Sequence, residues 1–246
     1  EIRLSLVGSE MCIRDRTLDT ETADLSGNVY DLGYIIHDKD GNQLTSYNAL
    51  VSEIFTQPKI MMGAFYAKKL FSHYAPMLDN SEITMRPWQE IIDQLRADIV
   101  EYNVTTIAAY NIGFDMRAMS NTHKSLTGEN RVLQSKIKVL DIWQFACEAK
   151  LKSRNYKKIA ESFGWVSPKG NIKTGAEFAY RFCSGDHGFI EDHTALSDCV
   201  IEVEILRQCF KTKKKIPYNV YNKAPWRLVN PSAKGKDKNI HGSVVA

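Results

Sequence analysis

Short runs of apolar and β-branched residues predict three strands near the start of the chain. Residues 29–37 and 43–51 are both rich in β-forming side chains, and the Asp40-Gly41 pair between them is typical of a tight hairpin turn. A third run around residues 18–22 is followed by turn-forming residues at 26–28. The pattern predicts an antiparallel meander of three strands.

Apolar residues at helical spacing dominate the rest of the chain. The clearest helical patterns are at 84–102, with Pro87 in the first turn, and at about 192–210. A third helix is predicted at 57–71, where Gly63 makes the pattern less regular. Two short strands are expected at 105–110 and 136–140. Further helices are expected after residue 111 and at 142–151, 154–163 and 174–183. Asp141 is the expected N-cap of the helix at 142–151. Strands alternating with helices predict an α/β domain.

The composition is that of an ordinary globular protein of 246 residues, with 43% hydrophobic and 25% charged residues. No apolar run approaches the roughly 20 residues of a membrane helix, and no secretion signal is visible, so we expect a cytoplasmic protein with no membrane partner. The five cysteines form no C-x-x-C pair and are expected to be reduced thiols.

Residues 6–16 resemble the translated end of an adapter used to make sequencing libraries. We therefore predict that residues 1–16, including Cys12, are not native and do not belong to the fold. The alternative is a genuine N-terminal arm with an accidental match. The charges of Asp15 and Arg16 are also poorly suited to the centre of a sheet.

Two carboxylates, Asp19 and Glu21, stand one residue apart in the first predicted strand. Side chains alternate along a strand, so both point to the same face. Like charges this close raise each other's pKa unless a cation lies between them, and a hard divalent ion with oxygen ligands is the usual solution. Taken alone, such a pair is more often a solvated turn.

Two later segments carry further polar groups. Asn111, Phe114 and Asp115 follow a short strand and begin a helix, and His193 and Asp198 stand five residues apart at the start of the last long helix. Each has an ordinary alternative. Asp115 alone could cap its helix, Asp198 could be a solvated helix position, and His193 could be a surface histidine. His187 is the rival base if the third segment is misaligned.

The order and spacing of these segments resemble the DEDDh branch of the DEDD 3′ to 5′ exonucleases, which includes the proofreading epsilon subunit, ribonuclease T, oligoribonuclease and many phage enzymes. The resemblance covers residues 18–210, with Thr22, Asn111, Phe114 and Ala195 as motif neighbours of the five defining positions. It implies a ribonuclease-H-like α/β fold with a five-stranded mixed sheet flanked by helices. The expected division is an exonuclease domain at 17–210 and a basic extension at 211–246.

The resemblance also implies a mechanism and a set of site residues. Two divalent metal ions, Mg²⁺ or Mn²⁺, would be held by carboxylates: Asp19, Glu21 and Asp198 around the ion that binds the attacking water, and Asp19 with Asp115 around the other. His193 would be the general base, and its distance from Asp198 places it in the loop before the helix. The substrate-binding residues would be Thr22, Ala23, Leu25, Asn111 and Phe114.

The expected partner is nucleic acid with a free 3′ end, with DNA preferred to RNA, in a phage or bacterial protein that could act beside a DNA polymerase or another replication protein. A module that binds nucleic acid without cleaving it is the alternative from another class. The basic extension is either a solvated helix end or, with Tyr218, Tyr221 and Trp226, a flank that binds the strand. Tyr66, Phe71, Trp88 and Trp165 are expected in the core or at its edges. The basic residues of the extension are Lys211, Lys213, Lys214, Lys215, Lys223, Arg227, Lys234, Lys236 and Lys238.

Overall fold

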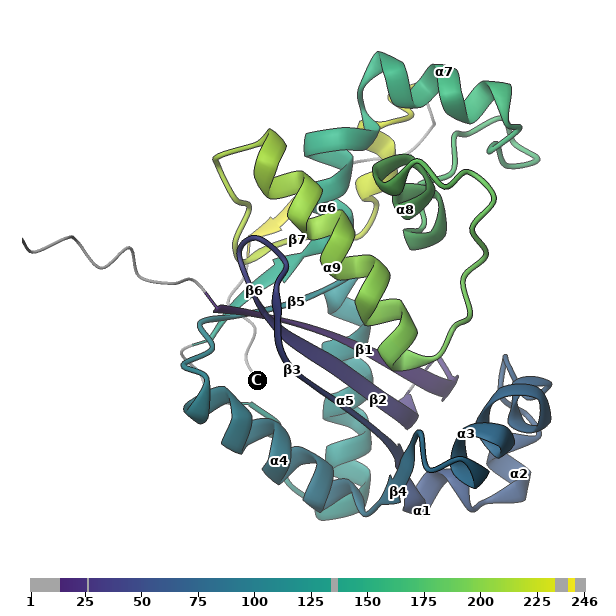
Figure 1. Cartoon of the computed structure of the whole chain (residues 1–246), viewed down its shortest axis with the longest axis vertical. Helices are drawn as coiled ribbons and strands as arrows, with labels where there is room; N and C mark the ends of the chain where they lie inside the picture. Colours follow the sequence, from purple (N-terminus) through teal and green to yellow (C-terminus); the bar gives the residue numbers. More distant parts are fainter. Residues whose placement is uncertain (1–13, 26, 134–136, 233–238, 242–246) are drawn as a thin grey trace, which may run out of the picture.

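The computed structural model of the chain describes residues 14–25, 27–133, 137–232 and 239–241, and its centre is a six-stranded mixed sheet (Figure 1). The strand order is β4-β3-β2-β1-β5-β6. The first three strands form the predicted antiparallel meander, and β1, β5 and β6 run parallel to one another. The strands of this sheet are β1 Arg14–Asp24, β2 Gly27–Asp38, β3 Gln43–Val51, β4 Thr84–Arg86, β5 Thr106–Ala109 and β6 Lys138–Asp141.

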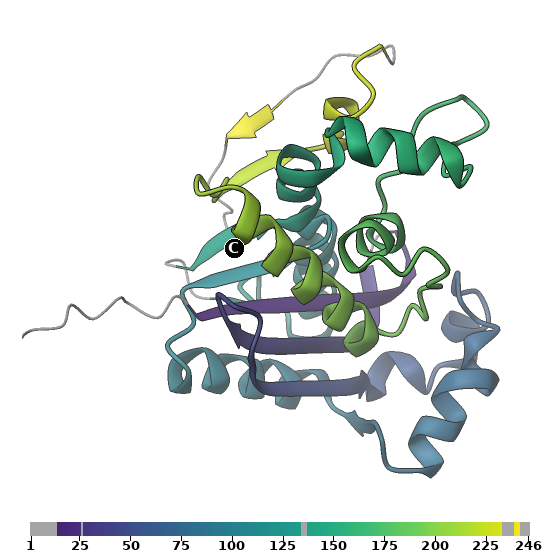
Figure 2. The ribbon, with the colours of Figure 1, turned by 45° about the horizontal axis from the view of Figure 1, so that its top comes forward.

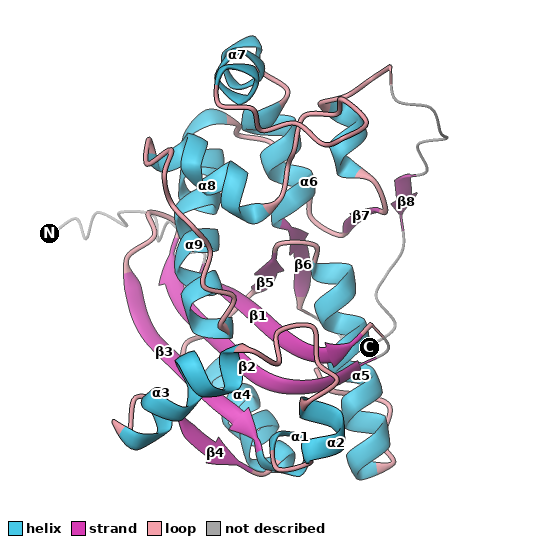
Figure 3. Cartoon of the chain, turned by 90° about the vertical axis from the view of Figure 1, so that its right-hand side faces the viewer, coloured by secondary structure: helices cyan, strands magenta, loops and turns pink. Residues whose placement is uncertain are grey.

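Helices cover both faces of the sheet, as Figures 2 and 3 show, which confirms the predicted α/β class and agrees with a ribonuclease-H-like fold. α9 lies against β1 and β2 on one face, and α4 and α5 pack on the other. The helical segments of the described residues are α1 Ser52–Phe55, α2 Pro58–Met61, η1 Leu70–Tyr74, α3 Ala75–Asp79, α4 Trp88–Glu101, α5 Ile112–Thr127, α6 Ile142–Ala146, η2 Cys147–Leu151, α7 Arg154–Ser162, α8 Ala176–Ser184, α9 Ala195–Thr212 and η3 Pro225–Leu228. None of them is both long enough and apolar enough to cross a membrane.

Two predicted helices are wrong in part. The helix predicted at 84–102 begins only at Trp88, and Pro87 is the N-cap. Residues 84–86 pair instead with β3 as the short strand β4, so the prediction of five strands is wrong and the sheet has six. The helix predicted at 57–71 is broken into α2 and a series of turns before η1, and Gly63 lies among those turns. We call residues 52–83, which join β3 to β4, the inserted segment.

The core includes two of the four aromatic residues expected there. Trp88 and Trp165 are buried, whereas Phe71 is 76% exposed and Tyr66 is 36% exposed. Both exposed rings belong to the inserted segment. Phe71 therefore lies outside the core and its edges, contrary to the prediction, and Tyr66 is not buried in the core, because this segment lies at the end of the sheet rather than on one of its faces (Figure 1).

The C-terminal part of the chain covers the outer edge of the sheet. Tyr218 forms an antiparallel bridge with Leu140 of β6. Next to it the Asn219 amide donates to the Val139 carbonyl at 2.7 Å, and the Asn219 side chain accepts from the Val139 amide at 2.9 Å. A further pair of strands, β7 Val220–Asn222 and β8 Asn239–His241, follows. The boundary predicted at residue 210 falls inside α9, and the division of the chain into three segments stays a proposal.

Two charged residues from the segment predicted to be foreign are buried in β1, and residues 1–13 lie outside the described part. Arg16 is partly accommodated. Its Nη1 donates to the Leu95 carbonyl at 3.0 Å and its guanidinium lies 4.2 Å from the Tyr34 ring centroid, although Nε and Nη2 find no partner among the described residues.

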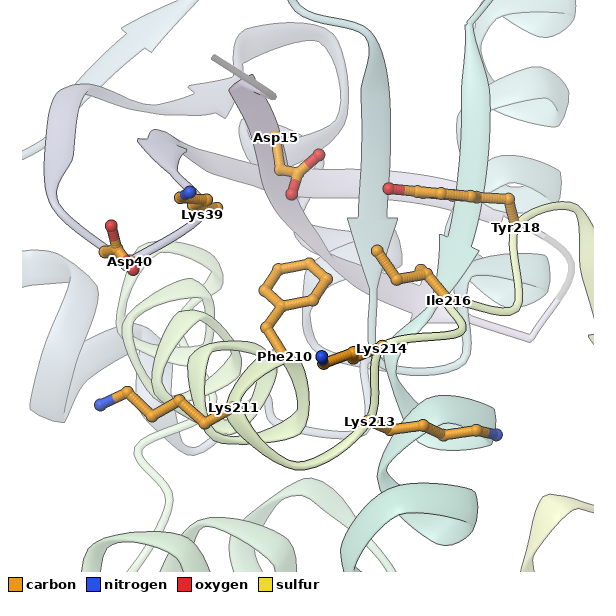
Figure 4. A pocket seen from close by; sticks show the side chains of 9 residues that line it. All are labelled: Asp15, Lys39, Asp40, Phe210, Lys211, Lys213, Lys214, Ile216 and Tyr218. Carbon is orange, nitrogen blue, oxygen red and sulfur yellow. The ribbon is translucent and has the colours of Figure 1, made fainter. Parts of the chain in front are cut away.

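Asp15 is less well accommodated. It is fully buried, and neither carboxylate oxygen has a hydrogen-bond partner in the described part of the chain. Figure 4 shows the carboxylate turned towards Phe210 and the hydroxyl end of Tyr218, at the edge of a cavity of about 310 Å³. Burial raises the pKa of Asp15 from 3.8 to about 6. An ionised Asp15 therefore destabilises the fold.

Replacing Asp15 by asparagine is expected to stabilise the protein in a pH-dependent manner. The pKa of Asp15 is higher in the folded chain than in the unfolded one, so its contribution to stability falls as the pH rises from 3.8 to about 6. At pH 8, Asp15→Asn should raise the free energy of unfolding by on the order of 3 kcal/mol, and at pH 4.5 by only about 1 kcal/mol. Urea unfolding at both pH values measures the difference. Asp40→Asn, the same change on the exposed hairpin, should have little effect, and an equal gain at both pH values would contradict the argument.

Candidate active site

The acidic pair lies at the carboxyl end of β1, where that strand pairs with β2. Asp19 is opposite Gly33 and Glu21 is opposite Asp31, and the register shifts between Glu21 and Thr22. Both carboxylates open onto one cavity of about 420 Å³, as the alternation along a strand predicts. The cavity is lined by Asp19, Thr20, Glu21, Thr22, Leu25, Phe65, Tyr66, Tyr110, Phe114, Asp115 and His193.

The third carboxylate comes from the first turn of α5. The turn from β5 into this helix passes through Asn111, which is the N-cap in the left-handed region at φ 71°. It brings Asp115 to the end of β1, where the carboxylate accepts a hydrogen bond from the Thr20 hydroxyl at 2.8 Å. Asp115 is 2% exposed. The Asp115 carboxylate is therefore held against β1 by a hydrogen bond and has almost no contact with solvent.

The fourth carboxylate and the histidine come from the start of α9. Asp198 is buried in the first helical turn, and His193 lies in the loop just before the helix, as its spacing predicts. The His193 Nδ1 atom is 3.6 Å from a Glu191 oxygen and 4.0 Å from an Asp198 oxygen. Ligand atoms of Glu21, His193 and Asp198 all lie within 4.8 Å of one another. The rival histidine, His187, packs instead against the ring of Phe163, with 4.6 Å between centroids.

The carboxylates are brought together at an electrostatic cost. Burial, with repulsion from Asp198 next, raises the pKa of Glu21 to about 9. Burial followed by the charge of Glu191 raises the pKa of Asp198 to about 8, and burial raises that of Asp115 to about 7. The pKa of Asp19 is also raised, by burial and then by Asp115.

A divalent cation fits this donor set. Hard ions such as Mg²⁺ and Mn²⁺ take carboxylate oxygens, and their charge would remove the repulsion that raises these pKa values. The residues that could hold such ions are Asp19, Glu21, Asp115 and Asp198. Lys69 is the protein cation whose charge opposes the raised pKa of both Glu21 and Asp198.

Two further carboxylates support the site. Glu202 follows Asp198 by one turn of α9 and is buried; its Oε1 accepts from the Tyr110 amide at 3.1 Å, and its Oε2 has no partner among the described residues. Asp31 of β2 accepts from the Ala195 amide at 3.0 Å and from the Tyr74 hydroxyl at 2.8 Å. Both could have been found from the sequence. Glu202 is four residues after Asp198, which puts the two on the same face of a helix, and Asp31 is an acidic residue within an apolar strand.

The five residues predicted to bind substrate are placed differently from one another. Thr22, Leu25 and Phe114 line the cavity. Ala23 is buried in the hydrophobic core, and Asn111 is an exposed helix cap. Their roles stay predictions. The cavity wall also includes Phe65, which the sequence did not single out, and Tyr66, which was expected in the core or at its edges.

Comparison with known proteins gives one distant likeness to report. No family model matches the chain, and no curated protein matches it. Among solved structures, the chain is similar to one described as Exonuclease X in complex with 5′ overhanging duplex DNA. The identity is 16%, the TM-score is 0.47, and the alignment covers 82% of this chain and 93% of that chain. At this level of similarity the function has to be inferred from the site itself.

Gly33 allows α9 to approach the sheet closely enough for Asp198 to lie beside Glu21 and His193. A Cβ atom at Gly33 would lie 2.5 Å from the Leu196 amide nitrogen and 2.7 Å from the Ala195 carbonyl carbon. Both are backbone atoms in the first turn of α9. Neither can move without moving the start of the helix.

Gly33→Ala is therefore expected to destabilise the protein by about 1–3 kcal/mol, the usual cost of overpacking. It should also weaken Mn²⁺ binding, because the displaced helix carries Asp198. Urea unfolding with and without Mn²⁺ measures both effects. Gly63→Ala is the control, since its Cβ would meet only ordinary contacts at 3.5 Å. A Gly33→Ala protein as stable as the parent would show that α9 is not held against this point.

Proposed function

We propose that this protein is a metal-dependent 3′ to 5′ exonuclease that hydrolyses phosphodiester bonds at the 3′ end of DNA and releases nucleoside 5′-monophosphates. The observation that carries the proposal is that three carboxylates and a histidine, Asp19, Glu21, Asp115 and His193, line one cavity, while a fourth carboxylate, Asp198 of α9, has a ligand atom within 4.8 Å of those of Glu21 and His193. Acidic clusters with a metal-ligand donor set and a nearby base suit the hydrolysis of phosphate esters. The order of the motifs in the sequence supports the same reaction.

In this proposal the carboxylates bind the metal ions and orient the phosphate, and the histidine accepts a proton from the attacking water. Two divalent ions, when bound, would supply positive charge against the charge that develops on the phosphate and would favour deprotonation of the attacking water. Asp19, Glu21, Asp115 and Asp198 would hold them. Thr20 fixes the orientation of the Asp115 carboxylate through its hydroxyl hydrogen bond.

His193 is the proposed general base. Burial, with the nearby charge of Lys69 second, lowers the pKa of His193 to about 4. The imidazole is therefore neutral at pH 7, the form that a general base needs, and the same shift makes it a weaker base than a free histidine. Its Nδ1 atom faces the carboxylates of Glu191 and Asp198. Proton transfer at this ring would therefore occur beside the metal-binding oxygens.

The cavity accounts for an attack at the end of a strand. Its volume of about 420 Å³ falls in the range of small-molecule sites, which is large enough for one nucleotide but not for a duplex. Leu25, Phe65 and Phe114 give it apolar walls on which a base could stack. A terminal nucleotide in this pocket would place its phosphate at the carboxylates. DNA is the proposed substrate, and RNA is the alternative of the same class.

Removing one metal ligand tests the reaction. Asp19→Asn and Asp198→Asn are each expected to abolish Mg²⁺-dependent shortening of a 5′-labelled oligonucleotide from its 3′ end. Neither should lower the melting temperature of the metal-free protein, because each change relieves repulsion between buried carboxylates. The parent should be stabilised by Mn²⁺ in a thermal melt, and both variants much less so.

Asp93→Asn, on the exposed face of α4, serves as the matched control and should behave as the parent. Full activity in either ligand variant would reject the proposed site. DNA and RNA oligonucleotides of one sequence, compared in the same assay, decide the substrate. Binding of either without any cleavage would instead support the non-catalytic binding module.

His193→Ala is expected to lower turnover by about 10² or more, the usual contribution of a general base. Thermal stabilisation by Mn²⁺ should be largely retained, because the four carboxylates remain. His187→Ala should leave turnover unchanged, since that ring packs between Phe163 and Trp165. The opposite result for the two histidines would assign the base to His187.

A further inference from the structure

The inserted segment contacts the loop that carries His193. Both lie at the end of the sheet where β1 finishes (Figures 1 and 3). Two of its side chains make the contact, Tyr66 to the His193 ring and Lys69 to the backbone of Asp192. These contacts join parts of the chain that are more than 120 residues apart.

The contact of Tyr66 with His193 is a parallel stack. The ring centroids are 4.6 Å apart and the planes differ by 16°. Lys69 donates through Nζ to the Asp192 carbonyl, and the same Nζ lies 4.4 Å from the centroid of the Tyr66 ring. The lysine therefore contacts both the tyrosine and the residue before the histidine. Tyr66, Lys69, Asp192 and His193 form one connected group.

The loop has little else to hold the imidazole in place. Residues 189–194 have no regular secondary structure, and His193 is in the left-handed region at φ 53°, which costs a non-glycine residue energy. The hydrogen bond from the Ala195 amide to Asp31 fixes the start of α9, beyond the histidine. The carboxylate oxygens nearest to Nδ1 are 3.6 and 4.0 Å away, too far for a hydrogen bond. The stack on Tyr66, by contrast, contacts the face of the His193 ring and restrains its plane.

We propose that Tyr66 and Lys69 are positioning residues, which hold the His193 ring over the carboxylates in the orientation that proton transfer requires. This inference rests on the proposed function. Tyr66 fixes the plane of the imidazole, and Lys69 fixes the backbone of the loop that presents it. The inserted segment is then part of the active site, although none of its residues is among the metal ligands or the base.

Turnover is the first test. Tyr66→Ala should lower kcat by about 10-fold or more, because small errors in the position of a reacting group cost about this much, and KM should change by less than about 3-fold. Tyr66→Phe retains the ring and should restore kcat. Lys69→Met should also lower kcat, by loosening the loop. Phe71→Ala, which removes an exposed ring from the same segment, should match the parent.

A spectroscopic test separates this inference from the proposed function. The stacked tyrosine should shift the NMR signals of the His193 ring protons in the intact chain. The shift should be lost in Tyr66→Ala and kept in Tyr66→Phe and Phe71→Ala. If the parent keeps the shift but cleaves no nucleic acid, the proposed function fails while the contact stands. If the parent is active and Tyr66→Ala has the same kcat, or raises KM alone, the positioning role is overturned.

Discussion

Repulsion between buried carboxylates at the end of β1 is the constraint on which the rest of the site depends. Four acidic groups sit in and around one small cavity, and burial alone would favour their neutral forms. They come from three elements, and each element is held in place: β1 by pairing with β2, α5 by the turn at Asn111, and α9 by Asp31 and by its close approach at Gly33. The framework is rigid where the charges meet. Such a site stores unfavourable energy that a bound cation would release.

The other end of β1 shows what happens when a buried charge lacks this arrangement. The Arg16 guanidinium donates to a carbonyl and lies over an aromatic ring, whereas neither Asp15 oxygen has a hydrogen-bond partner among the described residues. The acidic groups at the carboxyl end of β1 form the proposed metal site. Asp15 takes part in no such site, and the foreign origin of residues 1–16 stays a prediction.

The parts of the molecule that were predictable from sequence depend on local patterns. The hairpin at Asp40-Gly41, the Asp141 cap, which accepts from the Gln144 amide, and the placement of His193 before α9 all follow from residues within one or two turns. The contacts that could not be predicted are non-local. Strand β4 has only three residues and exists because it pairs with β3. Nothing near Tyr66 or Lys69 in the sequence points to residues 192–193, so their place beside the base required the folded chain.

The pairing of residues 218–219 with β6 affects how readily the sheet can pair with another chain. An uncovered outer strand presents a row of free amide and carbonyl groups that invites another chain to add itself to the sheet. Residues 218–219 occupy these groups on β6, and β4 at the opposite edge offers only three residues for such pairing. The C-terminal part of the chain thus acts as a guard against polymerisation. Its lysines therefore stand on a segment that also protects the edge of the sheet.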